Sequence, residues 1–339
     1  MAPRLQMRFV SRRSALTQAA AAAAVLSLPA CDAEPAQGSG GIATDPADGI
    51  EPITPNDDFY VTTCCGTPPI DVDAWQLTFR ANGVVVAMVD LLTLEALEGR
   101  DREHTLQCIG SSTANQAISN AIWTGLPLTE VLDALGVTVP DAAVEMKFTG
   151  ADGYTTSLPV SDLGKPVWMV WRMNGDPLPE KHGTTVRLLV PGRYGMKNPK
   201  WITDLDFTDT PSLGFWESVG WSNTAEYQAN TFVRTPDDNT TVAAGTVDVL
   251  GTAYAGSDEI TRVEVSLDGG VTWTDAELTY QNGPDVWTLW RYTWTATEGV
   301  YRVQARCTTR AGTMSGGEFA TGNLDGWDGS MVVDVEVVA

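Results

Sequence analysis

The residue with the clearest capacity for chemistry is Cys108, which ends a strand-like run, HTLQC, and is followed by Gly110 and the hydroxyl residues Ser111, Ser112 and Thr113. This order is typical of a strand that runs into a polar turn. A thiolate in an electropositive, accessible turn reacts or binds metal, whereas a buried cysteine behaves as a small apolar side chain. Taken alone, the local pattern favours a buried structural cysteine.

The other cysteines do not suggest a disulfide framework. Cys64 and Cys65 are adjacent, and consecutive α-carbons, about 3.8 Å apart, are closer than an unstrained disulfide usually spans. Cys108 and Cys307 fall in different expected domains. We therefore expect no disulfide, and for Cys307, in the segment ARCTTRAG, a buried thiol.

The elements that must position these side chains change in character along the chain. Between about residues 53 and 209, short strands such as AWQLTF and VEMKFTG mix with one helix. In that helix Leu128, Val131, Leu132 and Leu135 recur at helical spacing, and Gly136 supplies the stop.

Beyond about residue 243 the strands alternate, as in RVEVSL and VYRVQARC, with a DGG turn at 268–270. This pattern indicates an all-β module. We expect its core or interface to draw on four tryptophans: Trp273, Trp287, Trp290 and Trp294.

The first 31 residues have the layout of an export signal, with four arginines, no acidic residue and an Ala-rich apolar segment. The pair Arg12 and Arg13, in SRRSAL, indicates the twin-arginine route. The sequence LPAC, which ends at Cys31, also resembles a bacterial lipoprotein signal, with Cys31 as the lipid anchor; simple cleavage nearby is the alternative. Residues 32–51, rich in Gly, Ala, Asp and Pro, indicate a tether.

The mature chain is strongly acidic. Removal of residues 1–31 leaves 17 cationic against 43 acidic residues, a net charge near −26. Such a charge repels polyanions, so the protein should not bind nucleic acid, and a small anionic substrate would need a local cationic pocket.

Three segments carry a resemblance to a known family. The first is LQCIG, followed by AIWTGLPL; the second is MNGDPLPEKHGTTVRLLVPGRYGMKNPKWI, from Met173 to Ile202; the third is RVEVSLDGGVTWTDAEL with VWTLWRYTW and GVYRVQAR. Their order and spacing resemble the sulfite oxidase family of molybdopterin-dependent oxidoreductases. The resemblance runs from about residue 52 to the end of the sequence.

The resemblance implies an α+β molybdopterin-binding domain at 52–235, followed by an immunoglobulin-like β-sandwich dimerisation domain at 236–339. It also implies a molybdenum ion held by a pterin dithiolene and the thiolate of Cys108, a soft ligand suited to such a site. Matched to the family's motifs, the cofactor-binding residues are Asp152, His182, Arg187, Asn198, Pro199 and Lys200. An arginine fork and a lysine charge suit the phosphate of the pterin.

The sequence also departs from the family pattern. Where sulfite oxidases carry FVRNH against the pterin, the aligned residues are Tyr60, Val61, Thr62, Thr63 and Cys64. The arginine and the histidine are missing, and Cys64 is expected to replace the histidine in a pterin contact rather than to bind the metal. After Cys108 the family's Asn and Arg are replaced by hydroxyl residues. Loss of a cation that pairs with a buried anion costs a few kcal/mol, which weakens sulfite as the main substrate.

Two further residues are matched to the substrate pocket. Trp123 aligns with the tryptophan that lines the family's substrate channel. Arg291, in WRYTW, aligns with an arginine of the second domain; a cation stacked on the neighbouring tryptophans is the equal alternative.

The resulting hypotheses fall into two classes. The first is an exported enzyme that moves an oxygen atom to or from a small substrate, either by sulfite oxidation or by reduction of a sulfoxide or other neutral oxide. The sequence contains no CxxCH haem signature, so this hypothesis requires an external electron carrier such as a cytochrome c. A periplasmic or membrane-anchored location and a homodimer follow from the signal and the family. The second class is a non-catalytic binding or interaction protein on the same scaffold.

Overall fold

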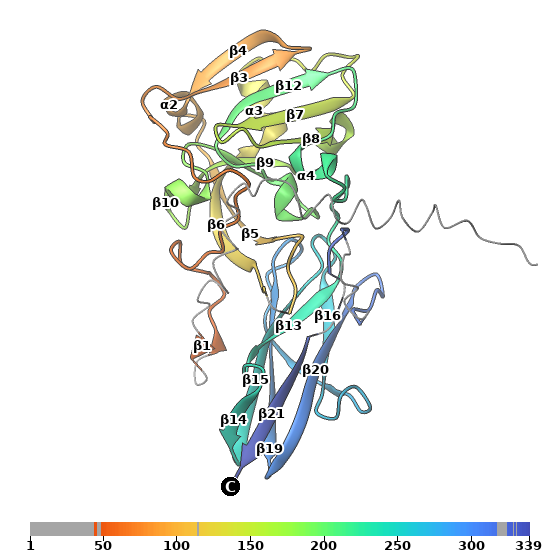
Figure 1. The fold of residues 1–339 in the computed structure, drawn as a ribbon. Coiled ribbons are helices and arrows are strands. Elements are labelled where there is room, and N and C mark those ends of the chain that lie inside the picture. Colours follow the sequence, from red (N-terminus) through yellow and green to blue (C-terminus); the bar gives the residue numbers. More distant parts are fainter. Residues whose placement is uncertain (1–43, 46–48, 114, 317–323, 328, 330) are drawn as a thin grey trace, which may run out of the picture.

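The computed structural model describes residues 44–45, 49–113, 115–316, 324–327, 329 and 331–339. The expected export signal, Arg12, Arg13, Cys31 and most of the expected tether lie outside these ranges. The described part consists of two β-rich modules, stacked end to end (Figure 1).

Two sheets build the first module. One sheet has the order β10-β9-β6-β5, with β11 also on β9, and comprises β5 (Arg100–Gln107), β6 (Ile118–Pro127), β9 (Trp168–Met173), β10 (Asp176–Pro177) and β11 (Arg187–Leu189). The other has the order β4-β3-β12-β7-β8 and comprises β3 (Gln76–Ala81), β4 (Val84–Asp90), β7 (Glu145–Gly150), β8 (Thr155–Pro159) and β12 (Ile202–Thr208).

The expected strands and helix of this module are present. The helix is α3 (Leu128–Ala134), which buries Leu128, Val131 and Leu132, and Gly136 follows with φ +65°. A glycine tolerates this left-handed conformation without a steric penalty and ends the helix.

Helices make a small contribution to the described residues of the first module. The α-helices are α2 (Leu91–Glu95), α3 and α4 (Phe215–Ser218), and the 3-10 helices are η1 (Val160–Gly164), η2 (Glu180–His182) and η3 (Gly195–Lys197). The expected α+β balance therefore shifts strongly toward β structure. Helices this short are only marginally stable alone and depend on packing against the rest of the module.

The second module is a two-sheet sandwich. Its sheets have the orders β13-β15-β19-β18 and β14-β21-β20-β16-β17. The strands are β13 (Asn230–Thr235), β14 (Thr240–Ala243), β15 (Gly245–Tyr254), β16 (Ile260–Ser266), β17 (Thr274–Asp275), β18 (Glu277–Tyr280), β19 (Thr288–Ala296), β20 (Gly299–Thr309) and β21 (Val332–Val338). The short strands β1 (Thr44–Asp45) and β2 (Gly49–Ile50) pair with each other.

The boundary between the modules lies earlier than expected. Strand β13, a stretch of six residues, pairs with β15 and so belongs to the sandwich. The expected boundary after residue 235 is wrong because it cuts off an integral strand of the second module.

Three of the four tryptophans expected in the sandwich core are there. Trp287, Trp290 and Trp294 are buried. Trp273 is half-buried and is covered instead by the guanidinium of Arg306, 4.2 Å from the ring centroid. Cys307 is buried in the same core, as expected.

No helix within the described ranges has the length and apolar character required to cross a bilayer.

Candidate functional site

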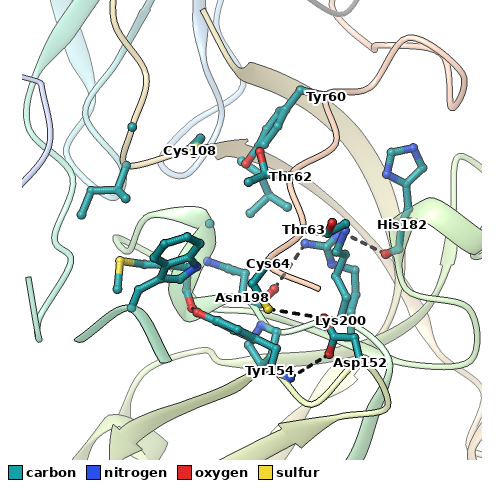
Figure 2. A pocket seen from close by; sticks show the side chains of 18 of the residues that line it. Tyr60, Thr62, Thr63, Cys64, Cys108, Asp152, Tyr154, His182, Asn198 and Lys200 are labelled. Carbon is teal, nitrogen blue, oxygen red and sulfur yellow. Dashed lines mark hydrogen bonds between the residues drawn. The ribbon is translucent and has the colours of Figure 1, made fainter. Parts of the chain in front are cut away.

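A cavity of about 240 Å³ lies in the first module, and it gathers most of the side chains singled out from the sequence. The predicted residues in its wall are Tyr60, Thr62, Thr63, Cys64, Cys108, Asp152, His182, Arg187, Asn198, Pro199 and Lys200. Figure 2 shows Cys108 on the side of the cavity away from His182 and Lys200. The cavity therefore has a thiol end and a cationic end.

Cys108 follows directly after β5 and begins a tight turn. Its backbone N–H donates to the carbonyl of Ala117 (2.9 Å), and its own carbonyl accepts from Ser111 N–H (3.0 Å). The hydroxyl of Ser111 also bonds to Ala117, at 3.0 Å. Burial raises the pKa of the Cys108 thiol above its ordinary value. The thiol is therefore held in place and protonated, and binding of a metal must release its proton.

Tyr60 shares this end of the cavity with Cys108. Its N–H is bonded to the hydroxyl of Ser119, at 3.1 Å. Burial, reinforced by the proximity of Cys108, raises the pKa of Tyr60 well above its usual range. The phenol is thus a permanent hydrogen-bond donor.

The outward side of β5 is attached to the sandwich. Gln107 and Asn230 exchange two amide hydrogen bonds, at 3.2 and 3.1 Å. Thr105 accepts from Trp287 N–H at 2.8 Å through its hydroxyl and from Tyr254 Oη at 3.1 Å through its carbonyl. The second module therefore fixes the strand that delivers Cys108.

At the cationic end, Arg187 is a buried guanidinium in β11. Its Nη1 donates to the carbonyl of His182 (3.0 Å), and its Cζ lies 4.9 Å from the ring centroid of Trp123. Its Nε is buried without a hydrogen-bond partner, and none of the ion pairs found among the described residues includes it. Burial lowers its pKa to about 10. A buried cation without a carboxylate partner is a seat for an anionic ligand.

Lys200 supplies a second cation beside Arg187. Its Nζ donates to the carbonyl of Lys181 (2.9 Å) and lies 4.2 Å from the ring centroid of Trp201. Burial, and then the neighbouring Arg187, lower its pKa to about 7, while Asp152 acts in the opposite direction. An anion bound here would restore the charge of the ammonium.

Asp152 and His182 complete this end. The Asp152 carboxylate accepts from Tyr154 N–H at 3.0 Å, and burial raises its pKa. The Nε2 atom of His182 lies 2.8 Å from the carbonyl oxygen of Asn56, so Nε2 carries the proton and Nδ1 is an acceptor. Burial lowers the pKa of His182 to about 4, so the ring is neutral.

Asn198 lines the cavity but uses its amide to shape the loop around it. Its Oδ1 accepts from Val190 N–H (2.6 Å), and its Nδ2 donates to the carbonyls of Arg193 (3.1 Å) and Tyr194 (3.0 Å). The adjacent Pro199 is held by its carbonyl, which accepts from Leu188 N–H at 3.1 Å. These residues therefore fix the loop backbone against the cavity.

Three predicted site residues do not reach the cavity wall. Val61 is half-buried and lies outside it. Trp123 is fully buried, donates from Nε1 to the carbonyl of His104 (3.0 Å) and lies beneath Arg187. Strand β6 directs the ring into the core, where it packs against the guanidinium of Arg187 and does not reach the cavity wall.

Arg291 is also elsewhere. It lies in β19, opposite Leu250 of β15, and borders a separate cavity near Gly49 and Pro52. Its charged partner is Asp248, at 4.0 Å. Arg291 therefore lies outside the wall of the main cavity, and no cation–π contact of Arg291 with a tryptophan is present among the described residues.

Several wall residues were not expected from the sequence. They include Ile109, Gly110, Tyr154, Met196, Trp216 and Trp221. A methyl group added to Gly110 would lie 3.8 Å from Cys108 Sγ and 3.9 Å from the Trp221 ring, so Trp221 stands near the thiol end. Tyr154 follows Asp152 in FTGADGY and could have been linked to it. Trp216 lies in the short helix α4 and Trp221 follows it, and neither carries a signal in the sequence.

Comparison with known proteins agrees with this geometry. Residues 65–216 match the oxidoreductase molybdopterin-binding domain, and residues 222–311 match the Mo-co oxidoreductase dimerisation domain. The mitochondrial sulfite oxidase of Rattus norvegicus is 30% identical over 268 residues, which cover 67% of this chain and 49% of that protein. The sulfite oxidase of Arabidopsis thaliana is 26% identical over 280 residues, which cover 68% and 71%.

Among solved structures, the sulfane dehydrogenase SoxCD from Paracoccus pantotrophus shares the fold, with a TM-score of 0.75 at 20% identity over 84% of this chain and 82% of that one. The chain belongs to the sulfite oxidase family of molybdenum-dependent oxidoreductases. Its first module is the molybdopterin-binding domain and its second the dimerisation domain. The chain spans about half the length of the mammalian relatives it matches.

The residues present fit the molybdenum–molybdopterin cofactor that this family carries. The fit rests on the buried Nε of Arg187, which has no partner, on the cation of Lys200 beside it, and on one thiol, Cys108, at the other end of the same cavity. Arg187 and Lys200 would hold the anionic part of the cofactor, and Cys108 would hold the metal.

Proposed function

We propose that this protein transfers an oxygen atom between its molybdenum centre and a small substrate whose reacting group is neutral, with reduction of a sulfoxide or related oxide as the reaction. The proposal rests on the segregation of charge in the cavity. Close to Cys108 the wall includes Trp221 and the hydroxyls of Tyr60 and Thr62, none of them charged. Trp221 packs with three further uncharged wall residues, Ile109, Met196 and Trp216.

The charged side chains of the wall belong to the opposite end. Asp152, Arg187 and Lys200 are the charged wall residues, and His182 is neutral. If the two cations are occupied by the cofactor, no described cation of the wall remains for an anionic substrate. A neutral oxide with an apolar substituent would gain from the aromatic wall without such a partner.

When bound, the cofactor supplies the two-electron change that accompanies oxygen-atom transfer. The chain's own residues position and shield it. Cys108 would give up its proton to hold the metal, and its backbone bonds to Ala117 and Ser111 fix the backbone that carries the sulfur. Trp216 and Trp221, both half-buried, would limit the access of water to the thiol end and so strengthen polar interactions there.

Sulfite oxidation is the second candidate, and it is favoured by the names of the relatives at 26–30% identity. Against it stand Thr62 and Cys64, uncharged wall residues at the positions where the sulfite oxidase pattern has its Arg and His.

Turnover distinguishes the two reactions. Molybdenum-loaded protein is assayed with sulfoxides and a reducing dye, and with sulfite and an oxidising dye. We expect turnover of the sulfoxides; turnover of sulfite alone would refute the neutral-substrate proposal. Absence of molybdenum in protein from a host that makes the pterin would support the non-catalytic alternative. The Cys108→Ser variant should lose both metal and activity while it keeps its fold.

We also propose the cellular setting. The arginine pair in SRRSAL and the LPAC segment support export by the twin-arginine route, with a lipid anchor at Cys31 and a location on the outer side of the inner membrane. An external carrier such as a cytochrome c would exchange electrons with the metal. We further propose that the sandwich is of the immunoglobulin-like type and joins two copies of the chain, as the name of its matched family suggests.

A further inference from the structure

Two adjacent cysteines form a feature of the cavity wall that the proposed function does not use. The Sγ atoms of Cys64 and Cys65 lie 2.6 Å apart. Non-bonded heavy atoms normally stay about 3.5 Å or more apart. The two sulfurs are therefore within reach of a covalent bond after a very small movement.

The local backbone holds the sulfurs together. The chain bends at Cys64 and Cys65, and the N–H of Gly66 donates to the hydroxyl of Thr63 at 3.2 Å, which closes the bend. Gly66 has φ +80°, a conformation that glycine adopts readily. The bend thus presents both side chains on the same side.

The two cysteines differ in their surroundings. Cys64 is buried in the cavity wall, with Sγ 4.0 Å from Asp152 Oδ2 (Figure 2), and it interacts electrostatically with Lys200. Cys65 is exposed. One sulfur therefore faces the cofactor site, and the other faces reagents in solution.

We propose that Cys64 and Cys65 are a redox-active vicinal pair, which closes to a disulfide on reaction with a disulfide-class oxidant. The thiolate of Cys65 attacks the oxidant, RSSR, to give a mixed disulfide and RS⁻. The thiolate of Cys64 then attacks the Cys65 sulfur, forms the intramolecular bond and expels a second RS⁻. Two cysteine protons are released, and the two electrons end on the two molecules of RS⁻.

The adjacency that argues against a permanent bridge favours a reversible one. Consecutive α-carbons are about 3.8 Å apart, below the usual range for disulfides of about 4.4–6.8 Å. Disulfides outside that range are more easily reduced, and exposed or strained ones are the labile class. The pair should therefore cycle with the thiol–disulfide balance of its surroundings.

Closure would change the cavity chemically. In the open form the Cys64 thiol lies in the wall beside Asp152 and Lys200. In the closed form neither sulfur of the pair can become a thiolate. Closure would therefore remove an ionisable thiol from the cationic end of the cavity.

The test is a thiol analysis of the full-length chain, prepared without cofactor, after equilibration with oxidised or reduced glutathione. The protein is denatured, its remaining thiols are alkylated, and the peptide with both cysteines is weighed by mass spectrometry. We expect the oxidised sample to lack two hydrogens and to carry neither label nor glutathione, with full recovery of two labels after reduction. A peptide that keeps both labels, or carries glutathione, at equilibrium would overturn the proposal.

Variants identify the partners. The Cys64→Ser and Cys65→Ser proteins cannot form the ring, so the remaining cysteine should end as a mixed disulfide with glutathione or stay reduced. Cys307→Ser, which removes a buried cysteine of the sandwich core, is the matched control and should behave as the wild type. If the Cys64→Ser or the Cys65→Ser protein still lost two thiols without gaining glutathione, another cysteine would be the partner.

Phenylarsine oxide gives an independent readout, because a trivalent arsenical is chelated by two neighbouring thiols and not by one. The reduced wild type should bind it stoichiometrically, whereas the oxidised wild type and the Cys65→Ser protein should not. Equal binding by all three would refute the pair. Neither experiment measures turnover, so their outcome is independent of the proposed reaction.

Discussion

Replacing Arg187 by methionine should separate cofactor binding from folding. Methionine keeps an unbranched apolar stem against Trp123 while it removes the charge. Burial lowers the pKa of Arg187 to about 10, a shift that corresponds to a penalty of about 3 kcal/mol on the charged form. Because pH 7 lies below both the folded and the unfolded pKa, the penalty is fully present there.

In the cofactor-free protein, the substitution removes this penalty, and the interactions that it also removes nearly offset the gain in stability. The hydrogen bonds from Arg187 to the carbonyls of His182 and Asn198 contribute about 1 kcal/mol each, and the cation–π contact with Trp123 adds about 1 kcal/mol. The free energy of unfolding of the cofactor-free variant should therefore stay within about 1 kcal/mol of the wild type. In the loaded protein, each lost charge-assisted bond to an anion costs about 1.5–3 kcal/mol, which is tenfold or more in cofactor affinity.

The assay is thermal unfolding of Arg187→Met and wild type, each purified from a host that makes the pterin and from one that does not, with the molybdenum content measured in parallel. Arg234→Met is the matched control. Arg234 is a second buried arginine, with a pKa lowered to about 9 by burial, and it lies outside the cavity wall. The Arg234→Met substitution should change the melting temperature of the loaded and of the cofactor-free protein by the same amount. Equal destabilisation of both forms by Arg187→Met would refute the assignment of Arg187 to the cofactor.

Three further predictions follow from the same geometry. In the cofactor-free protein the pKa of Lys200, about 7, lies below its value in the unfolded chain, so the unfolded chain binds more protons between pH 7 and 10. The free energy of unfolding of the wild type, measured in urea, should therefore rise relative to that of Lys200→Met as the pH increases from 7 to 9. A difference in free energy that does not change with pH would contradict this. Trp221→Ala should lower kcat/KM for aromatic sulfoxides more than for dimethyl sulfoxide at unchanged molybdenum content; an equal loss for both would remove Trp221 from the substrate wall. Asn230→Ala leaves the buried Gln107 amide without its partner and should destabilise the fold by about 1–3 kcal/mol; unchanged urea unfolding would show that the pair contributes nothing.

The cationic end of the cavity could be predicted from the sequence because its residues lie in one ordered motif. Within the Met173–Ile202 segment, Arg187 lies in the short strand β11, and His182 and Asn198 lie in or beside 3-10 turns. The hydrogen bonds there, such as those from the Asn198 side chain to the carbonyls of Arg193 and Tyr194, are local. Side chains that are close in the sequence of such a segment are therefore also close in the folded protein. The helix at Leu128–Ala134 was predictable for the same reason, since its period is visible over a single stretch.

The residues at the thiol end of the cavity, and the position of Arg291 in the second module, could not be predicted from the sequence. They depend on contacts between segments that are distant along the chain. Trp216 and Trp221 follow an irregular stretch and are placed by packing near Ile109, Tyr194 and Met196. The position of Arg291 depends on the register of β19 against β15, which pairs it with Leu250. A pattern of alternating residues shows that a strand exists, but not which neighbour it meets.

The attachment of β5 to the sandwich has a consequence for recombination between family members. The N–H, hydroxyl and carbonyl of Thr105 are all bonded to residues of the second module, and Gln107 is matched to Asn230. A first module joined to a foreign sandwich would leave the N–H and carbonyl of Thr105 and the amide of Gln107 without these partners, at about 1–3 kcal/mol for each group that stays buried. The two modules are therefore constrained to change together, and a working chimaera would have to carry Gln107 and Asn230 as a pair.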